Sequence, residues 1–187
     1  MAGVATPREL RRDALRNQQD LVRAATAAVH REGLRVPMRT IAADAGVGIG
    51  TLYRHFPTRD DLLSHLTHRS FEQVLTNAHT AEREGATPID SLRLFVDAAI
   101  SQRNELVLPL HGGPPLTSTA TVTVRTNVHS VLHRIIDRGI ADGTLRPDVT
   151  PRDIVFGAIV AQPRPTDPDW DDTCRRLLAT YLRGIAV

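Results

Sequence analysis

The fold of this chain is constrained most by one segment, Pro37–Phe56, which reads PMRTIAADAGVGIGTLYRHF. In its first half, apolar residues recur at the i, i+3, i+4 and i+7 spacing of a buried helix face, which predicts a short helix over Met38–Ala45. Gly46 follows, where a sharp turn needs a residue that tolerates a positive φ angle. A second short helix is predicted from about Gly48 through Phe56. Two short helices joined by a tight turn form a helix-turn-helix, whose second helix fits the major groove of DNA.

The second predicted helix has two different faces. Leu52 and Phe56 lie four residues apart and form its inward side. The outward side carries hydroxyl, guanidinium and imidazole groups and no acid, so it suits a surface rich in phosphate. We expect Tyr53 and His55 to contact phosphates, whereas Arg54 lies where base edges are read. The residues predicted to contact DNA are Thr40, Gly48, Ile49, Gly50, Thr51, Tyr53, Arg54, His55 and Arg59.

The remaining sequence has helical patterns and no strand pattern of useful length. Three helices are predicted to open with Thr58, Thr87 and Thr150, each followed three residues later by an Asp that completes the cap. At the first of these caps, Arg59 is expected to add to the phosphate affinity of a helix start. The fold class is therefore all-α, with about nine helices. Beyond the helix-turn-helix, the predicted helices span about residues 18–32, 58–83, 88–105, 119–142 and 169–185, with another beginning near residue 151.

A known family matches the central segment. The residues Ala45–Phe56, AGVGIGTLYRHF, with Pro57 and Leu62 beyond them, closely resemble the DNA-binding signature of TetR-family transcriptional regulators. The resemblance is specific over about residues 17–66, and beyond them it rests on size and helix layout. It implies a three-helix DNA-binding domain (18–64) and a C-terminal helical domain for ligand binding and dimerisation (65–187). The arginines before them indicate a basic N-terminal arm (1–17).

Two positions depart from the family pattern. Many members have Thr at the place of Pro37 and Ser or Thr at the place of Gly48, and those side chains cap a helix or contact phosphate; neither residue here can do so. The resemblance implies a homodimeric repressor that binds a palindromic operator in double-stranded DNA. A small-molecule effector would release it. The sequence assigns no ligand-binding residue and no cofactor.

Charge is unevenly spread along the 187 residues, although the net charge is only +2. Residues 1–70 hold eleven arginines and seven acids, whereas the rest of the chain holds twelve arginines and fourteen acids. The front third is therefore the candidate nucleic-acid face. The arm is either a disordered or frayed helical extension that is merely solvated, or a segment that follows DNA phosphates or enters the minor groove. Its place beside the helix-turn-helix favours DNA. Its arginines are Arg8, Arg11, Arg12 and Arg16.

The last predicted helix offers a surface for self-association. Trp170, Leu177, Leu178 and Tyr181 give it a broad apolar stripe. We expect a homodimer built largely through the last two helices, with this stripe paired symmetrically against Ile154–Ile159 of the partner.

Other candidate sites have less support. His129 and His133 have the i, i+4 spacing that lets two imidazoles share a metal, but no third ligand is suitably spaced, so we expect pocket-lining or surface residues and no metal. His111, in the Gly/Pro-rich segment 106–118, is a candidate to contact or gate a ligand. No nucleophile–base–acid pattern appears, so we expect no enzyme. The single Cys174 is expected to be an inert core residue.

The expected location is the cytoplasm, with no membrane partner. The polar N-terminus lacks a signal peptide, and no apolar run approaches the ~20 residues of a membrane span. The alternative function is a helical protein-interaction module that uses its helix-turn-helix for a partner protein without operator binding. The excess positive charge over residues 1–70 favours DNA, and salt-dependent binding to duplex DNA separates the two hypotheses.

Overall fold

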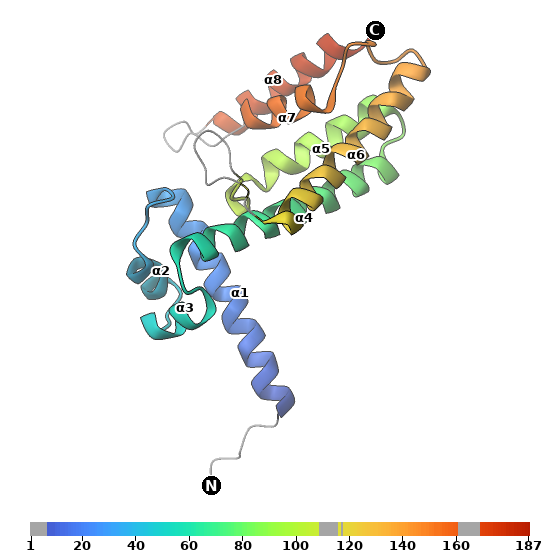
Figure 1. Ribbon diagram of the computed structural model, residues 1–187. Helices are drawn as coiled ribbons and strands as arrows, with labels where there is room; N and C mark the ends of the chain where they lie inside the picture. The colour runs from blue at the N-terminus through green and yellow to red at the C-terminus, as the bar shows by residue number, and fades with distance from the viewer. Residues whose placement is uncertain (1–6, 109–115, 117, 161–168) are drawn as a thin grey trace. The chain divides into compact units, whose positions relative to one another are not determined.

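Helices make up the architecture in the computed structural model, which describes residues 7–108, 116, 118–160 and 169–187. Within these ranges the chain forms eight α-helices, one short 3-10 helix and no strand (Figure 1), which confirms the predicted all-α fold. None of the described helices combines the length and hydropathy that crossing a membrane would need. The elements are α1 Pro7–Glu32, α2 Met38–Asp44, α3 Ile49–His55, α4 Arg59–Glu84, α5 Pro88–Ser101, η1 Arg103–Glu105, α6 Thr119–Ala141, α7 Pro151–Val160 and α8 Trp170–Ile185.

The chain divides into two compact units, Met1–Leu66 and Thr67–Val187. The first unit holds α1, α2, α3 and the first turns of α4, and the second holds the rest of α4 and every later helix. The boundary therefore falls inside α4, a continuous helix of 26 residues. The helix-turn-helix lies wholly within the first unit.

The core of the first unit is built around α1. Leu21, Ala25 and Ala28 are buried on this helix, and α1 packs against α2, which in turn packs against α3. Ile41 of α2 and Leu52 of α3 are buried in the same unit. Burial of each Leu or Ile side chain contributes roughly 1.5–3 kcal/mol, so these few residues fix how the short helices are held.

The N-terminal end of the first helix was wrongly predicted at Gln18, because α1 begins at Pro7. Proline is favoured at the first position of a helix, and no other Gly or Pro interrupts the chain up to Glu32. The predicted apolar stripe begins at Leu21, which is also the first of the buried residues described on α1, so hydrophobic periodicity identified only that part of the helix. Most of the predicted arm is thus helical backbone, and residues 1–6 lie outside the described ranges.

Among its described residues, the second unit encloses one hydrophobic cluster. Leu92 of α5, Leu132 and Ile135 of α6, and Ile154 of α7 are fully buried in it. The end of α8 is fastened to the turn that follows α6: Arg146 N–H donates to Ile185 O at 3.0 Å, and Val187 N–H donates to Thr144 O at 3.2 Å. The last helix is therefore held against the rest of the unit by backbone hydrogen bonds at its C-terminal end. These bonds flank an isolated antiparallel bridge between Leu145 and Ala186.

The three predicted Thr–Asp caps are confirmed. At α4, Asp61 N–H donates to Thr58 Oγ1 at 3.1 Å while Thr58 N–H donates to Asp61 Oδ2 at 2.9 Å, which is a reciprocal capping box. At α5, Asp90 N–H donates to the Thr87 hydroxyl at 3.2 Å. Before α7, Thr150 N–H donates to Asp153 at 2.8 Å. Each cap satisfies backbone donors that the helix start leaves unpaired.

The helix predicted to run to Glu105 is shorter, because α5 ends at Ser101 and a 3-10 turn, η1, follows. The tighter turn redirects the chain so that Leu106 and Val107 become buried. There the Val107 N–H donates to the Ser70 hydroxyl of α4 at 2.8 Å. A tertiary hydrogen bond, invisible to sequence periodicity, ends the helix.

The predicted inward stripe of α8 was wrong at one residue. Leu177 is 47% exposed, whereas Leu182, which the prediction left out, is buried together with Cys174 and Leu178. Positions 174, 178, 182 and 185 follow the i+4, i+4, i+3 spacing of one face, so Leu177 falls beside that face. The core position expected for Cys174 is confirmed. The segments carrying His111 and the proline-rich stretch 163–168 lie outside the described residues.

Candidate nucleic-acid interface

The turn between α2 and α3 is set by one glycine. Gly46 has a φ angle of 67°, in the left-handed region where a side chain is strained. Around it, Val47 N–H donates to Ala42 O at 3.0 Å and Gly46 N–H donates to Ala43 O at 3.0 Å. These two bonds form a Schellman motif, which ends α2 and turns the chain sharply into α3.

The recognition helix, α3, is anchored by two apolar side chains. Leu52 has no solvent exposure, and Phe56, just after the helix, is also buried, as the sequence predicted. Gly48 is the N-cap in extended conformation, and its carbonyl accepts from Thr51 N–H at 2.9 Å. With one side fixed in the core, the remaining side chains of α3 face outward.

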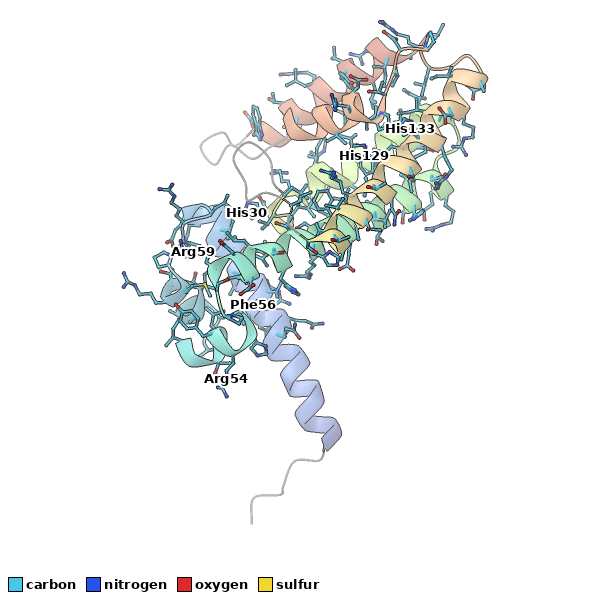
Figure 2. The ribbon with its side chains drawn as sticks, viewed as in Figure 1. His30, Arg54, Phe56, Arg59, His129 and His133 are labelled. Carbon is cyan, nitrogen blue, oxygen red and sulfur yellow. The ribbon has the colours of Figure 1, made fainter. Side chains whose placement is uncertain are left out.

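The outward face of α3 is broad and carries no acid. Ile49 is 42% exposed and Tyr53 is 48% exposed, and both are large side chains to leave in water. Arg54 and His55 are also exposed, and Figure 2 shows Arg54 projecting outward from the helix. A surface that combines apolar, hydroxyl and cationic groups can contact base edges and phosphates together.

Arg54 is held in place before any ligand is bound. Its Nη2 donates to the Thr51 hydroxyl at 3.0 Å, and its Nε donates to Gly50 O at 3.3 Å. The guanidinium is therefore drawn back over the first turn of α3. Holding a long side chain in one arrangement reduces the entropy lost on binding. The sequence placed Thr51 and Arg54 on one face but gave no signal of this bond.

The predicted contacts outside α3 occupy two other elements. Thr40 is half-buried on α2, and Arg59 is the first residue of α4. Figure 2 shows Arg59 well apart from Arg54, so these two side chains do not converge on one point. The Arg59 Nε is shielded from solvent and has no hydrogen-bond partner among the described residues. A buried donor left unpaired costs roughly 1–3 kcal/mol, so an incoming anion that draws the guanidinium outward would relieve that cost.

Two contacts hold the helix-turn-helix to its neighbours, and sequence reasoning missed both. The Phe56 ring at the end of α3 packs on the His65 ring of α4, with centroids 5.2 Å apart. Arg31 of α1 pairs with Asp44 of α2 at 2.7 Å. Pairs of residues distant in sequence give no local pattern, and only the fold brings them together.

The histidine pair on α6 has its two members in different environments. His129 is half-buried and His133 is exposed, and no group of three or more metal-ligating side chains occurs in the described residues. Burial lowers the pKa of His129, and the positive charges of Arg125, His133 and Arg152 lower it further. His129 is therefore held neutral to a lower pH than an ordinary histidine.

This shift predicts a pH dependence of stability. The folded-state pKa of His129 lies below its unfolded value of about 6.5, so the unfolded chain takes up the proton first as pH falls. The free energy of unfolding should therefore hold above pH 6.5 and decrease below it. In His129→Gln this part of the decrease should be absent. Denaturant titrations from pH 7.5 to 5 test this, and identical pH profiles for the two proteins would contradict it.

The buried anchors, the glycine turn and the acid-free exposed helix define the first unit as a helix-turn-helix DNA-binding domain. A family model described as bacterial regulatory proteins of the tetR family matches residues 21–66. Residues 21–66 therefore form a TetR-type DNA-binding domain, as the resemblance in the sequence indicated. The individual contact residues on this domain stay predictions.

Similar proteins agree with this assignment. The transcriptional repressor KstR of Mycolicibacterium smegmatis is 34% identical over 108 residues, which make up 56% of this chain and 53% of KstR. The chain thus spans about half the length of the curated relative it matches. The ketosteroid regulator KstR2 of Mycobacterium tuberculosis has the same fold, with a TM-score of 0.71 at 22% identity over 92% of this chain and 95% of that one. AibR, solved with isovaleryl coenzyme A and operator DNA, matches with a TM-score of 0.69 at 17% identity over 88% and 97%.

Proposed function

We propose that this protein is a transcriptional repressor that binds operator DNA as a homodimer and is released by a small molecule. The observation that carries the proposal is the exposed, acid-free face of α3, anchored from behind by Leu52 and Phe56. The relatives support it, since KstR is named as a repressor and AibR was solved with both an acyl coenzyme A and operator DNA.

In this proposal each residue of the α3 face has one of two tasks. Ile49, Gly50, Thr51 and Arg54 meet base edges in the major groove, with the Arg54 fork suited to guanine. Tyr53 and His55, with Arg59 from α4 and Thr40 from α2, contact phosphates and fix the register. Gly48 and Gly50 lack side chains, which lets the backbone approach the groove closely.

The remaining parts of the proposal concern the second unit. Residues 65–187 act as the effector-binding and dimerisation domain, residues 18–64 bind DNA, and residues 1–17 follow the DNA as a basic arm. The dimer forms through α7 and α8, where Leu177 is exposed and Tyr181 half-buried. An effector favours a subunit arrangement with a different spacing between the two α3 helices, so affinity for the operator falls.

The test of this function is selection of bound fragments from the source genome, followed by footprinting. We expect protection of a palindrome whose half-sites lie about one helical turn, ~34 Å, apart on one side of the duplex. Binding of equal strength to every fragment, or no binding at low salt, would overturn the proposal. In that case the helix-turn-helix would serve a partner protein instead.

Two substitutions distinguish a charged phosphate contact, proposed for Arg59, from a neutral one, proposed for the Tyr53 hydroxyl. Arg59→Gln should weaken binding to all DNA sequences and lower the slope of log affinity against log salt by about one per subunit, since one fewer counterion is released. Tyr53→Phe removes only an exposed hydroxyl, so affinity should fall while the slope is kept. Fluorescence anisotropy at several salt concentrations measures both. An unchanged affinity in both variants would place these residues off the DNA backbone.

A further inference from the structure

A row of basic side chains lies on α6, away from the helix-turn-helix. Arg125, His129 and His133 follow one another at intervals of four residues, so they line one face of the helix. Arg152 of α7 is close enough to act on His129 through its charge, and α6 and α7 pack together. Figure 2 shows His129 and His133 as neighbours along α6. Four nitrogen-bearing side chains from two packed helices therefore share the region around His129 in the second unit.

The arginines of this group, unlike many others in the unit, have no acidic partner. Arg134 forms a two-bond pair with Glu82 at 2.8 and 2.7 Å, and Arg146 pairs with Asp148 at 2.7 Å. Neither Arg125 nor Arg152 makes an ion pair with any residue in the described ranges. Their positive charge is thus available to a ligand.

The electrostatics at the centre of the group have one sign. The side chains whose charge shifts the pKa of His129 are Arg125, His133 and Arg152, and none of them is a carboxylate. His129 is also half-buried, so it lies where the dielectric constant is lower than in water and Coulomb attraction is stronger. Asp137, the next residue at this spacing on α6, is not among the groups that shift the pKa of His129, so the charge acting on the imidazole is positive. This excess of positive charge is unfavourable for a protonated imidazole in the empty protein and favourable for a bound anion.

We propose that Arg125, His129, His133 and Arg152 bind the phosphate group of a small molecule. Two guanidinium groups offer forked donors that match phosphate oxygens, and each imidazole adds an N–H donor. The second unit as a whole, residues 67–187, has no excess of positive charge, because it holds thirteen arginines and fourteen acids. The positive charge of these four side chains is therefore a local feature. Duplex DNA needs an extended basic surface, so a compact phosphorylated ligand fits this place better. The regulatory role of this phosphate site rests on the proposed function, in which a small molecule releases the repressor from DNA. The binding of phosphate at the site does not depend on that function.

The test is calorimetric titration of the full chain with inorganic pyrophosphate and with coenzyme A. We expect saturable binding of at least one probe, and the comparison of the two tells a free anion from an organic phosphate. Arg125→Gln and Arg152→Gln should each weaken binding on the order of tenfold. The matched control is Arg69→Gln on α4, an exposed arginine without an ion pair in the described part of the chain, which should stay within about twofold of wild type.

The pKa of the His129 ring provides a second test of the site. Bound phosphate should raise the pKa of His129, because an opposite charge favours the protonated ring. Titration of its ring protons by NMR, with and without pyrophosphate, measures this change. Saturable binding with no change at His129, or equal affinities in wild type, Arg125→Gln and Arg152→Gln, would overturn the proposal.

Operator affinity measured in the absence of pyrophosphate and coenzyme A separates a failure of this inference from a failure of the proposed function. Arg125→Gln and Arg152→Gln should bind operator as the wild type does. If they lose operator binding, the patch is a DNA contact and the phosphate site is refuted. If wild type binds no operator but still binds pyrophosphate through these residues, the repressor function fails while the site stands.

Discussion

Gly50→Glu protein is expected to fold, to assemble as the wild type does, and to lose operator binding. A Cβ atom at Gly50 would meet no atom within 4 Å, and its φ angle is not in the left-handed region, so the fold accepts a side chain there. A carboxylate in the first turn of a helix is favourable, and replacing glycine removes an intrinsic helix cost of roughly 1 kcal/mol. Thermal stability should hold or rise.

The loss of binding follows from charge and bulk in the groove. Like charges forced together at an interface cost several kcal/mol, so the operator affinity of Gly50→Glu should fall on the order of 100-fold or more. Gly50→Ala separates the two causes, since it adds bulk without charge. Ala27→Glu places the same charge on an exposed position of α1 and should bind nearly as wild type. Wild-type affinity in folded, dimeric Gly50→Glu would refute the placement of α3 in the major groove.

Removal of α8 is expected to unfold the second unit and abolish the dimer together. Cys174, Leu178, Leu182 and Ile185 are buried within one chain, and α8 packs on both α5 and α7. Truncating even one such Leu or Ile to Ala costs roughly 2–5 kcal/mol. The loss of all of them exceeds the total stability of an ordinary domain, about 5–15 kcal/mol.

A chain ended after Pro168 tests this by thermal unfolding and sedimentation. We expect no cooperative transition from residues 67–168 and no dimer. Leu177→Glu separates dimerisation from folding, because Leu177 is exposed: the unfolding temperature should hold while the dimer weakens on the order of tenfold. A shortened chain that unfolds cooperatively and sediments as a stable dimer would contradict both the core role of α8 and the proposed interface.

The parts of the fold that sequence predicted well depend on local chemistry. Gly46 could be assigned because its turn requires a positive φ angle, and the caps at Thr58, Thr87 and Thr150 could be assigned because donor and acceptor lie three residues apart. The errors arose where distant residues decide. The start of α1 at Pro7 was missed because the prediction relied on an apolar stripe that begins at Leu21.

In the candidate site, too, the features that depend on local sequence were predictable and those that depend on tertiary contacts were not. Residue types on the face of α3 were predictable, because Leu52 and Phe56 mark its buried side. The bond between Arg54 and Thr51 depends on the choice of rotamers, and the contact between Phe56 and His65 depends on where α4 lies beside α3. Neither follows from spacing. The basic group on α6 and α7 was likewise recognised only as a histidine pair, because Arg152 belongs to a different helix that the fold packs against α6.

The closure of the second unit by α8 has a consequence during protein synthesis. The ribosome makes α8 after α4, α5, α6 and α7, so the hydrophobic cluster stays incomplete and its apolar surface exposed until α8 has been made. The first unit, Met1–Leu66, contains only the first turns of α4 and none of α5 to α8, so it can form while the later helices are still being made. A nascent chain therefore passes through an interval with a folded DNA-binding domain and an exposed apolar surface, when chaperones and proteases have most access to it.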